Sequence, residues 1–270
     1  QGRTFSVHRG VALTAGLEGF RTATDLDPEY ARASSALADS DVMLCLWGYM
    51  SPEECWSNAI PASRKATQID PDLSETCHTR GIIALLYEND YQLAESQFKK
   101  AIKLNPTNTQ PRIWFGLFYC LYFQDNLEEG LKQCEIATIN DPLSGYAHNC
   151  YALALIYVNR LDEAEKESIQ GLKLDPESLF SHSLRSQILT LKGNFKKAHV
   201  EARICLKLAP KGTQFMTYLI NIYLKTGKPE LAHKMYAQVE KILKKDNIQP
   251  SYAAIGASLV GEKERAMQLF

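Results

Sequence analysis

Apolar and polar residues follow one another with the period of helices, in pairs of segments separated by short turns. Residues 144–176 illustrate this pattern. Ser144 is suited to cap a helix, Asn159-Arg160 forms a turn, and Pro176 ends the second segment because proline cannot continue the helical hydrogen bonds. The apolar positions of the two segments are Tyr151, Leu155, Tyr157, Leu161, Ala164, Ile169, Leu172 and Leu174. The pattern predicts a pair of helices, and no long alternating run of Val, Ile and Thr predicts a strand.

The same layout recurs along the chain. Successive segments end in Asp-Pro or a similar pair, with prolines at Pro28, Pro71, Pro106, Pro142, Pro176 and Pro210. The spacings between these prolines are 43, 35, 36, 34 and 34 residues. Small residues stand seven positions apart in each second segment, the first of each pair being Gly16, Ala59, Ala94, Gly130, Ala164 and Ala198. Such residues share one helix face, so they let a neighbouring helix approach closely.

This register resembles the tetratricopeptide repeat, a helix-turn-helix unit of 34 residues with small residues at positions 8, 20 and 27 and proline at position 32. The matching residues are Gly81, Ala94, Ala101 and Pro106 in one unit, Ala152, Ala164, Gly171 and Pro176 in another, and Ser186, Ala198, Cys205 and Pro210 in a third. The tryptophan of position 4 is replaced by Cys77, His148 and His182. The resemblance covers essentially the whole chain.

The expected fold is therefore all-α, a right-handed α-solenoid (superhelix) of about seven such units in one domain over residues 1–270. The units are expected at 1–28 (partial), 29–71, 72–106, 107–142, 143–176, 177–210, 211–249 and 250–270 (partial). We expect the chain to be cut at both ends, because Gln1-Gly2-Arg3 lacks an initiator Met and Phe270 falls within a second helix.

Three irregularities are expected. One residue is inserted at the turn Tyr87–Asp90, a longer insertion lies at Leu46–Met50, and the helix from about Glu230 extends through Lys245. Turns are also expected at Gly193-Asn194, Gly227 and Gly261.

Ser51-Pro52-Glu53-Glu54 is typical of a helix start, with Ser as N-cap and Pro in the first position. This helix should run to about Ile69, which places Pro61 inside it and predicts a kink near Asn58. The alternative is two short helices.

The resemblance implies that the first helix of each pair lines a concave groove, which suits an extended peptide or a partner helix. The candidate partner-binding residues are His78, Gln110, Tyr146, Asn149, Ser183, Gln187, Thr217 and Asn221. The alternative for each is a merely solvated side chain. Basic residues that could clamp a carboxylate are missing beside Asn149 and Asn221, so no carboxylate clamp is expected.

The aromatic run Trp114–Phe123 is the most apolar stretch of the chain. It is expected to be a first helix buried on most sides. The alternative is an exposed patch that docks a partner or a second copy of the chain.

Composition and charge narrow the classes of partner. The 30 Lys and Arg residues balance 31 Asp and Glu residues, which argues against charge-driven binding to nucleic acid or a membrane surface. No apolar stretch approaches the roughly 18 residues of a membrane-spanning helix. We therefore expect a protein or peptide partner, no nucleic acid, no membrane, and a possible homo-oligomer.

The sequence offers little for catalysis. The seven cysteines are odd in number and lack CxxC spacing, so reduced buried thiols and a cytoplasmic location are expected. No HExxH, GxSxG, P-loop or GxGxxG string occurs. We expect no catalytic residue, no cofactor and no metal, although a Cys–His pair brought together by the fold is left open.

A narrower resemblance concerns the first units. Gly2-Arg3, Gly16-Leu17, Asp27-Pro28-Glu29-Tyr30-Ala31 and the helix from Ser51 with internal Pro61 look like the repeats of bacterial multidomain regulators, in which an N-terminal output or sensing module precedes them. The resemblance implies a non-catalytic protein–protein interaction scaffold, the regulatory part of a larger signalling or transcription-regulating protein. The alternatives are a self-association module, or the C-terminal part of an enzyme such as a cyclase or kinase.

Overall fold

The computed structural model describes residues 11–46, 50–245 and 250–269, and every regular element within these ranges is helical. The chain divides into two compact units, Gln1–Arg160 and Leu161–Phe270. The insertion expected at Leu46–Met50 falls largely outside the described residues.

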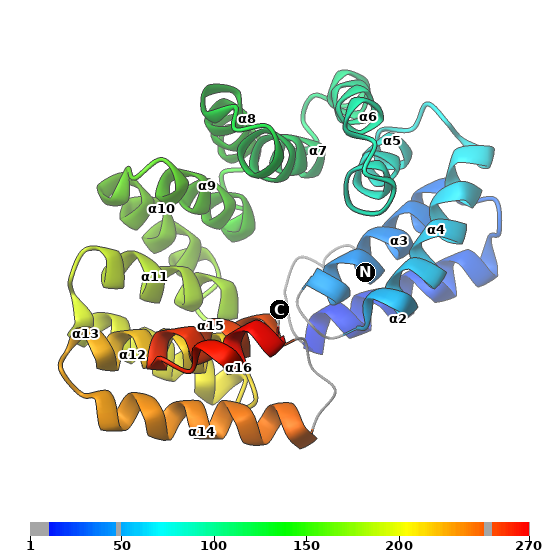
Figure 1. Cartoon of the computed structure of the whole chain (residues 1–270). Helices are drawn as coiled ribbons and strands as arrows, with labels where there is room; N and C mark the ends of the chain where they lie inside the picture. Colours follow the sequence, from blue (N-terminus) through cyan, green and yellow to red (C-terminus); the bar gives the residue numbers. More distant parts are fainter. Residues whose placement is uncertain (1–10, 47–49, 246–249, 270) are drawn as a thin grey trace. The chain divides into compact units, whose positions relative to one another are not determined.

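The first unit consists of helices that pack against their neighbours in the sequence (Figure 1). Its elements are α2 (Val11–Leu26), α3 (Ala31–Leu46), α4 (Pro52–Ile69), α5 (Ser74–Ile83), the π-helical turn η1 (Ala84–Glu88), α6 (Tyr91–Leu104), α7 (Thr109–Ile113), the π-helix η2 (Trp114–Phe123), α8 (Leu127–Asn140) and α9 (Gly145–Tyr157).

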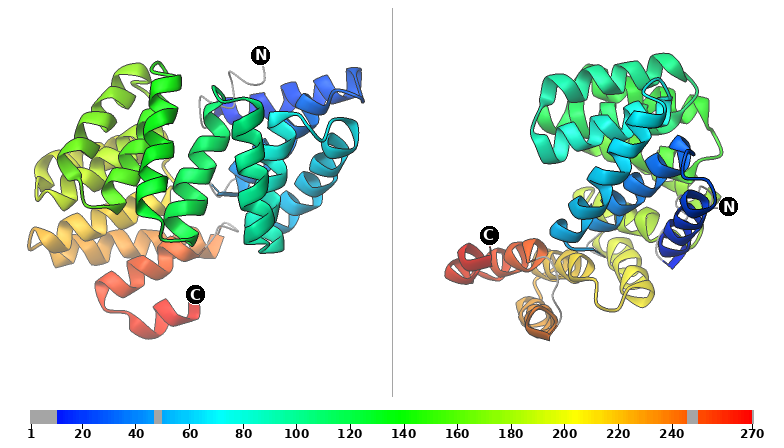
Figure 2. Two further views of the ribbon diagram at one scale, coloured as in Figure 1. Left: turned by 90° about the horizontal axis from the view of Figure 1, so that it is seen from above. Right: turned by 90° about the vertical axis from the view of Figure 1, so that its right-hand side faces the viewer.

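The second unit repeats this arrangement, and Figure 2 shows its consecutive helices from two further sides. Its elements are α10 (Leu161–Leu174), α11 (Leu179–Leu191), α12 (Phe195–Leu208), α13 (Thr213–Lys225), α14 (Pro229–Lys245), α15 (Ser251–Val260) and α16 (Lys263–Leu269). The predicted extension of one helix through Lys245 is confirmed by α14.

Helix starts follow the caps expected from the sequence. The Ser51 hydroxyl accepts a hydrogen bond from the Glu54 amide, and Ser144 does the same for Ala147. Helix α4 continues through Pro61 to Ile69, so the alternative of two short helices is wrong. The kink near Asn58 stays a prediction.

The described turns within the helix pairs share one backbone conformation. A residue with positive φ follows each first helix from α5–η1 to α15, and the next amide closes a hydrogen bond back onto that helix, as in a Schellman cap. Gly193 (φ 76°), Gly227 (φ 70°) and Gly261 (φ 91°) adopt this conformation without the penalty that a side chain imposes. The closing bonds of these turns run from Asn194 to Leu189, from Lys228 to Tyr223 and from Glu262 to Ala257.

Two first helices absorb extra residues as π-helix. In α9, α11 and α13 the first helix has 13 residues. The pair α5–η1 has ten residues of α-helix and five of π-helix, and α7–η2 has five and ten. The closing bonds here, Asp90 to Ala84 and Asn126 to Cys120, span six residues instead of five. The extra residue expected at the turn Tyr87–Asp90 is therefore wound into the helix, and that expectation is corrected.

Position 4 of the repeat keeps a structural role without tryptophan. Its side chain bonds to the carbonyl of the proline that ends the preceding helix, six residues earlier, in four successive pairs. The contacts are Cys77 Sγ to Pro71 O (3.3 Å), Arg112 Nε to Pro106 O (3.0 Å), His148 Nε2 to Pro142 O (3.1 Å) and His182 Nε2 to Pro176 O (3.1 Å). His148 and His182 are thus structural residues, as their shared repeat position indicates.

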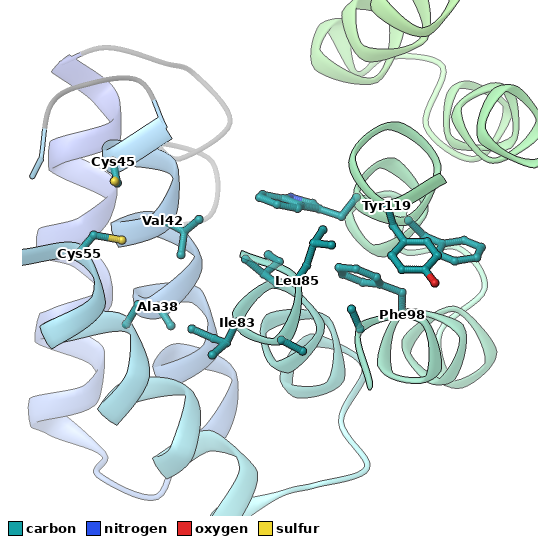
Figure 3. Close-up of a cluster of buried hydrophobic side chains, with 14 of the residues drawn as sticks. Ala38, Val42, Cys45, Cys55, Ile83, Leu85, Phe98 and Tyr119 are labelled. Carbon is teal, nitrogen blue, oxygen red and sulfur yellow. The ribbon is translucent and has the colours of Figure 1, made fainter. Parts of the chain in front are cut away.

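The core of the first unit lies between the helix pairs. Figure 3 shows its buried cluster, which runs from Cys45 and Cys55 to Phe98 and Tyr119. The aromatic run contributes Trp114, Phe115 and Tyr119, whereas Tyr122 and Phe123 at its end are exposed. The predicted burial on most sides is therefore confirmed.

Small residues bring the helices of a pair into backbone contact. A Cβ atom built on Gly116 of η2 would lie 2.8 Å from the Gly130 carbonyl oxygen of α8 and 2.9 Å from Gln133 Cβ. On Gly130 it would lie 2.5 Å from Leu121 Cγ. No real Cβ occupies such positions, so a side chain at either glycine would separate the two helices.

We predict that Gly116→Ala destabilises the chain by about 1–3 kcal/mol, because overpacking outweighs the gain in helix propensity. The melting temperature followed by circular dichroism should fall by several degrees. Gly256→Ala is the matched control, because its Cβ would meet no atom closer than 3.3 Å. Equal effects of the two substitutions would contradict the close approach.

Candidate partner-binding cavity

A cavity of about 530 Å³ lies over the first helices of the first unit. Four consecutive first helices contribute to it: α3, α5, α7–η2 and α9. Phe20 of α2, the segment after α6, and Asn140 and Asp141 at the end of α8 complete the lining. Its lining residues are Phe20, Ala36, Asp39, Ser40, Met43, Glu75, His78, Ile82, Asn105, Thr107, Asn108, Thr109, Gln110, Trp114, Asn140, Asp141 and Tyr146.

The eight candidate residues separate into two sets according to their place after the proline that ends the preceding unit. Four stand seven residues after it and are buried, with exposed fractions of 1% to 4%: His78, Asn149, Ser183 and Thr217. The other four stand four or eleven residues after it and are half-buried: Gln110, Tyr146, Gln187 and Asn221.

For Thr217, packing of one first helix against the next explains the burial. The Thr217 hydroxyl of α13 donates hydrogen bonds to Thr213 O (2.9 Å) and to Tyr252 O of α15 (3.0 Å). A position used for this contact has little surface left for a partner. Asn149 is likewise only 1% exposed and does not line the cavity.

His78, Gln110 and Tyr146 all line the cavity in the first unit. His78 is nevertheless 3% exposed, and its ring lies 6.1 Å from the rings of both Phe98 and Trp114. Gln110 and Tyr146 are the two candidates that combine a place in the cavity with an accessible side chain.

Asp39 is a lining residue that the sequence interpretation missed. It stands eleven residues after Pro28, at the register position of Gln187 and Asn221, so counting from the proline would have found it. Its Oδ1 accepts a hydrogen bond from Thr79 Oγ1 at 2.6 Å, and its Oδ2 lies 3.6 Å from His78 Nε2. These contacts fix the carboxylate at the wall between α3 and α5.

Carboxylates give the cavity its charge. Asp39, Glu75 and Asp141 line it, and none of its lining residues is a lysine or arginine. Arg32 contacts Glu75 from outside this set, with its Nε atom 3.2 Å from Glu75 Oε1. The wall therefore favours a ligand that carries positive charge or many hydrogen-bond donors.

The candidates of the second unit lie on α11 and α13. Next to Ser183 and Gln187 on α11, His182 and Arg185 contact Glu201 of α12. The His182 Nδ1 atom lies 2.6 Å from Glu201 Oε2, and the Arg185 Nε atom lies 3.0 Å from Glu201 Oε1. Burial would raise the pKa of Glu201, but these two hydrogen bonds outweigh it and lower that pKa. The cluster holds two helices of one pair together.

The cysteines are poorly suited to nucleophilic chemistry. All seven are buried free thiols. Burial raises the pKa of the Cys120 and Cys205 thiols to about 12, and it also raises those of Cys45, Cys55, Cys77 and Cys134. A thiol at such a pKa is almost never the reactive thiolate.

Two further findings concern the described ranges 11–46, 50–245 and 250–269. No helix in them is long and apolar enough to cross a membrane. In the same ranges, no three His, Cys, Asp or Glu side chains are grouped so that they could hold a metal ion.

Comparison with known proteins agrees with this geometry. Residues 74–108, which form α5, η1 and α6, match the family model of the tetratricopeptide repeat. Comparison with curated proteins finds no match.

Solved structures with similar folds include yeast Tom70 (TM-score 0.61, 17% identity, 95% of this chain and 60% of that chain covered). They also include the APC/C hetero-tetramer Cut9–Hcn1 (TM-score 0.68, 14% identity, 92% and 45% covered) and PilF of Pseudomonas aeruginosa (TM-score 0.58, 15% identity, 80% and 93% covered). The chain thus spans less than two thirds of the length of the Tom70 chain.

The resemblance to the tetratricopeptide repeat is confirmed: the fold is that of tetratricopeptide repeat proteins, and one repeat matches the family model directly.

We predict that an aromatic disulfide reagent at pH 8 labels less than about one thiol per folded chain within minutes, because burial suppresses the thiolate. All seven should react in denaturant. Ser96→Cys, at an exposed position of α6, is the control for reagent access and should label at once. Rapid labelling of one native cysteine of the folded parent chain would instead reveal an activated nucleophile.

Proposed function

We propose that the chain is a non-catalytic protein-interaction scaffold that binds an extended segment of a partner protein in the cavity over α3, α5, α7 and α9. The observation that carries this proposal is the continuous lining by four first helices, with accessible polar and aromatic side chains such as Gln110 and Tyr146. The similar Cut9–Hcn1 structure, a hetero-tetramer, supports a role in protein assembly.

The charge of the cavity defines the partner segment further. Because Asp39, Glu75 and Asp141 line it, a segment with a lysine or arginine gains favourable electrostatic energy there. Tyr146 offers an aromatic face against which the stem of such a side chain packs.

The wider role is part of the same proposal. The resemblance of the first units to bacterial multidomain regulators supports a regulatory scaffold within a larger signalling or transcription-regulating protein. The seven free thiols are consistent with a cytoplasmic location. Their burial and raised pKa values support binding without chemistry.

A random peptide library selected on the whole chain tests the proposal. We expect enriched peptides that contain Lys or Arg and bind with a Kd in about the micromolar range, more weakly at high salt. Tyr146→Ala should weaken binding by about 5- to 30-fold, since an aromatic contact contributes about 1–2 kcal/mol. Gln110→Ala should weaken it less.

Tyr157→Ala is the matched control, because Tyr157 lies on the same helix α9, is 48% exposed and does not line the cavity. This variant should bind the selected peptides as the parent does. Equal binding by Tyr146→Ala and the parent chain, or loss of binding only in Tyr157→Ala, would exclude the cavity as the binding site.

A further inference from the structure

A cluster of polar side chains lies in the second unit, where α12 packs against the end of α13. His199 of α12 and Tyr223 of α13 are in contact: the His199 Nε2 atom lies 3.2 Å from the Tyr223 hydroxyl oxygen, and the ring centroids are 5.6 Å apart. Arg203 stands four residues after His199 and therefore on the same helix face. None of these residues lines the partner-binding cavity, so a ligand bound here is independent of the proposed function.

Lys228 joins the cluster from the turn between α13 and α14. Its amide donates the hydrogen bond that closes this turn to the Tyr223 carbonyl oxygen, at 2.8 Å. The charges of Arg203 and Lys228 both reach the His199 ring. Burial and then these two positive charges lower the pKa of His199. The cluster therefore combines an imidazole and a phenol hydroxyl with two cations.

The same repeat position in the first unit carries a carboxylate instead. Glu95 of α6 stands at the position of His199, directly after the small residue of the repeat. It also contacts a tyrosine of the next first helix, because the Tyr119 hydroxyl donates to Glu95 Oε2 at 3.3 Å. Lys99, four residues after Glu95, donates to its Oε1 atom at 2.6 Å. In α6 the basic side chain is thus neutralised by its neighbour on the helix.

In α12 that carboxylate is absent. Arg203 stands at the repeat position of Lys99, but His199, four residues before it, carries no negative charge. Within the part of the chain that the structure describes, no ion pair holds Arg203 or Lys228. Both side chains are exposed, whereas His199 and Tyr223 are half-buried. The cluster therefore presents two cations to solvent beside a hydrogen-bonded imidazole.

The surrounding sequence supplies little negative charge. Residues 195–245 contain 11 Lys and Arg but only 3 Asp and Glu, although the whole chain has a formal net charge of −1. Two of these three carboxylates already have basic partners, since Glu201 contacts Arg185 and Glu240 contacts Arg265. The surface around the cluster is thus left with an excess of positive charge, which attracts an anion.

The donors of the cluster select among anions. A phosphate monoester has three terminal oxygens and about 1.5 to 2 negative charges near pH 7. Arg203 offers a guanidinium that can bind two of these oxygens, and Lys228 offers an ammonium. The His199 ring adds a third donor, Nδ1–H, when the hydroxyl of Tyr223 donates to Nε2. A carboxylate or a nucleic-acid phosphodiester carries a single charge, so either would leave one cation without compensation.

We propose that His199, Arg203 and Lys228 bind a phosphate monoester dianion between α12 and the turn after α13. A phosphorylated serine or threonine of a partner protein and a small phosphorylated molecule both supply this group.

Titration calorimetry on the whole chain at low ionic strength tests the proposal with two probes of the same shape. Phenyl phosphate is close to a dianion at neutral pH, whereas phenyl sulfate is a monoanion. Phenyl phosphate should bind with a Kd below about 1 mM, and phenyl sulfate at least tenfold more weakly. Equal affinities, or no binding of phenyl phosphate at about 10 mM, overturn the proposal.

Two further probes identify the source of the phosphoryl group. Tighter binding of a phosphoserine peptide of degenerate sequence than of glycerol 3-phosphate supports the proposal with a partner protein as the source. The reverse order supports it with a small molecule as the source. Equal binding of the peptide with and without its phosphate overturns the proposal.

Variants of the exposed cations separate recognition from folding. Arg203→Gln and Lys228→Gln should each weaken phenyl phosphate binding at least fivefold without lowering the melting temperature, because both side chains are exposed. Lys99→Gln, at the repeat position of Arg203 in α6, is the matched control and should bind like the parent. Parent-like affinity of both cluster variants, or equal weakening in the control, overturns the proposal.

His199→Glu gives an independent readout. It introduces the carboxylate that Glu95 supplies in α6, four residues before a basic side chain. The variant should lose phenyl phosphate binding, because the new charge repels the ligand and pairs with Arg203, yet it should melt no lower than the parent. A merely structural role of His199 predicts lower stability and unchanged affinity, and that result overturns the proposal.

Discussion

The close contact between the two helices of each pair is the constraint on which the rest of the structure depends. Gly116 and Gly130 allow η2 and α8 to touch through their backbones, and Gly81 lies directly against the Phe98 ring. A pair held this closely presents its first helix to the first helix of the next pair. The lining of the partner-binding cavity by α3, α5, α7 and α9 follows from this succession.

Extra residues are accommodated without breaking that succession. The spacings of 35 and 36 residues exceed the regular 34, and the structure winds the excess into π-helix at Ala84–Glu88 and Trp114–Phe123. If the extra residues formed longer loops instead, the ends of the helices would be unchanged. Winding instead lengthens the two first helices that form the middle of the cavity wall, and it places Tyr122 and Phe123 at an exposed end.

Much of the fold could be predicted because proline, glycine and small residues recur at fixed spacing. The location of the extra residue could not be predicted, because the same local sequence can place an added residue either in a turn or in a π-helix. The site was only partly predictable for a similar reason. His78 and Gln110 both belong to a first helix, but burial of the position seven residues after proline depends on the neighbouring helix.

Residue-resolved amide hydrogen exchange of the native chain tests most directly whether the insertions are wound into the first helices. The amides of Asp90 and Asn126, which close the six-residue bonds, should be protected to a similar degree as those of Arg160 and Asn194 in the regular pairs. Exchange near the unfolded rate across residues 84–90 and 114–126 would contradict it, because the extra residues would then form loops and the cavity wall would be interrupted.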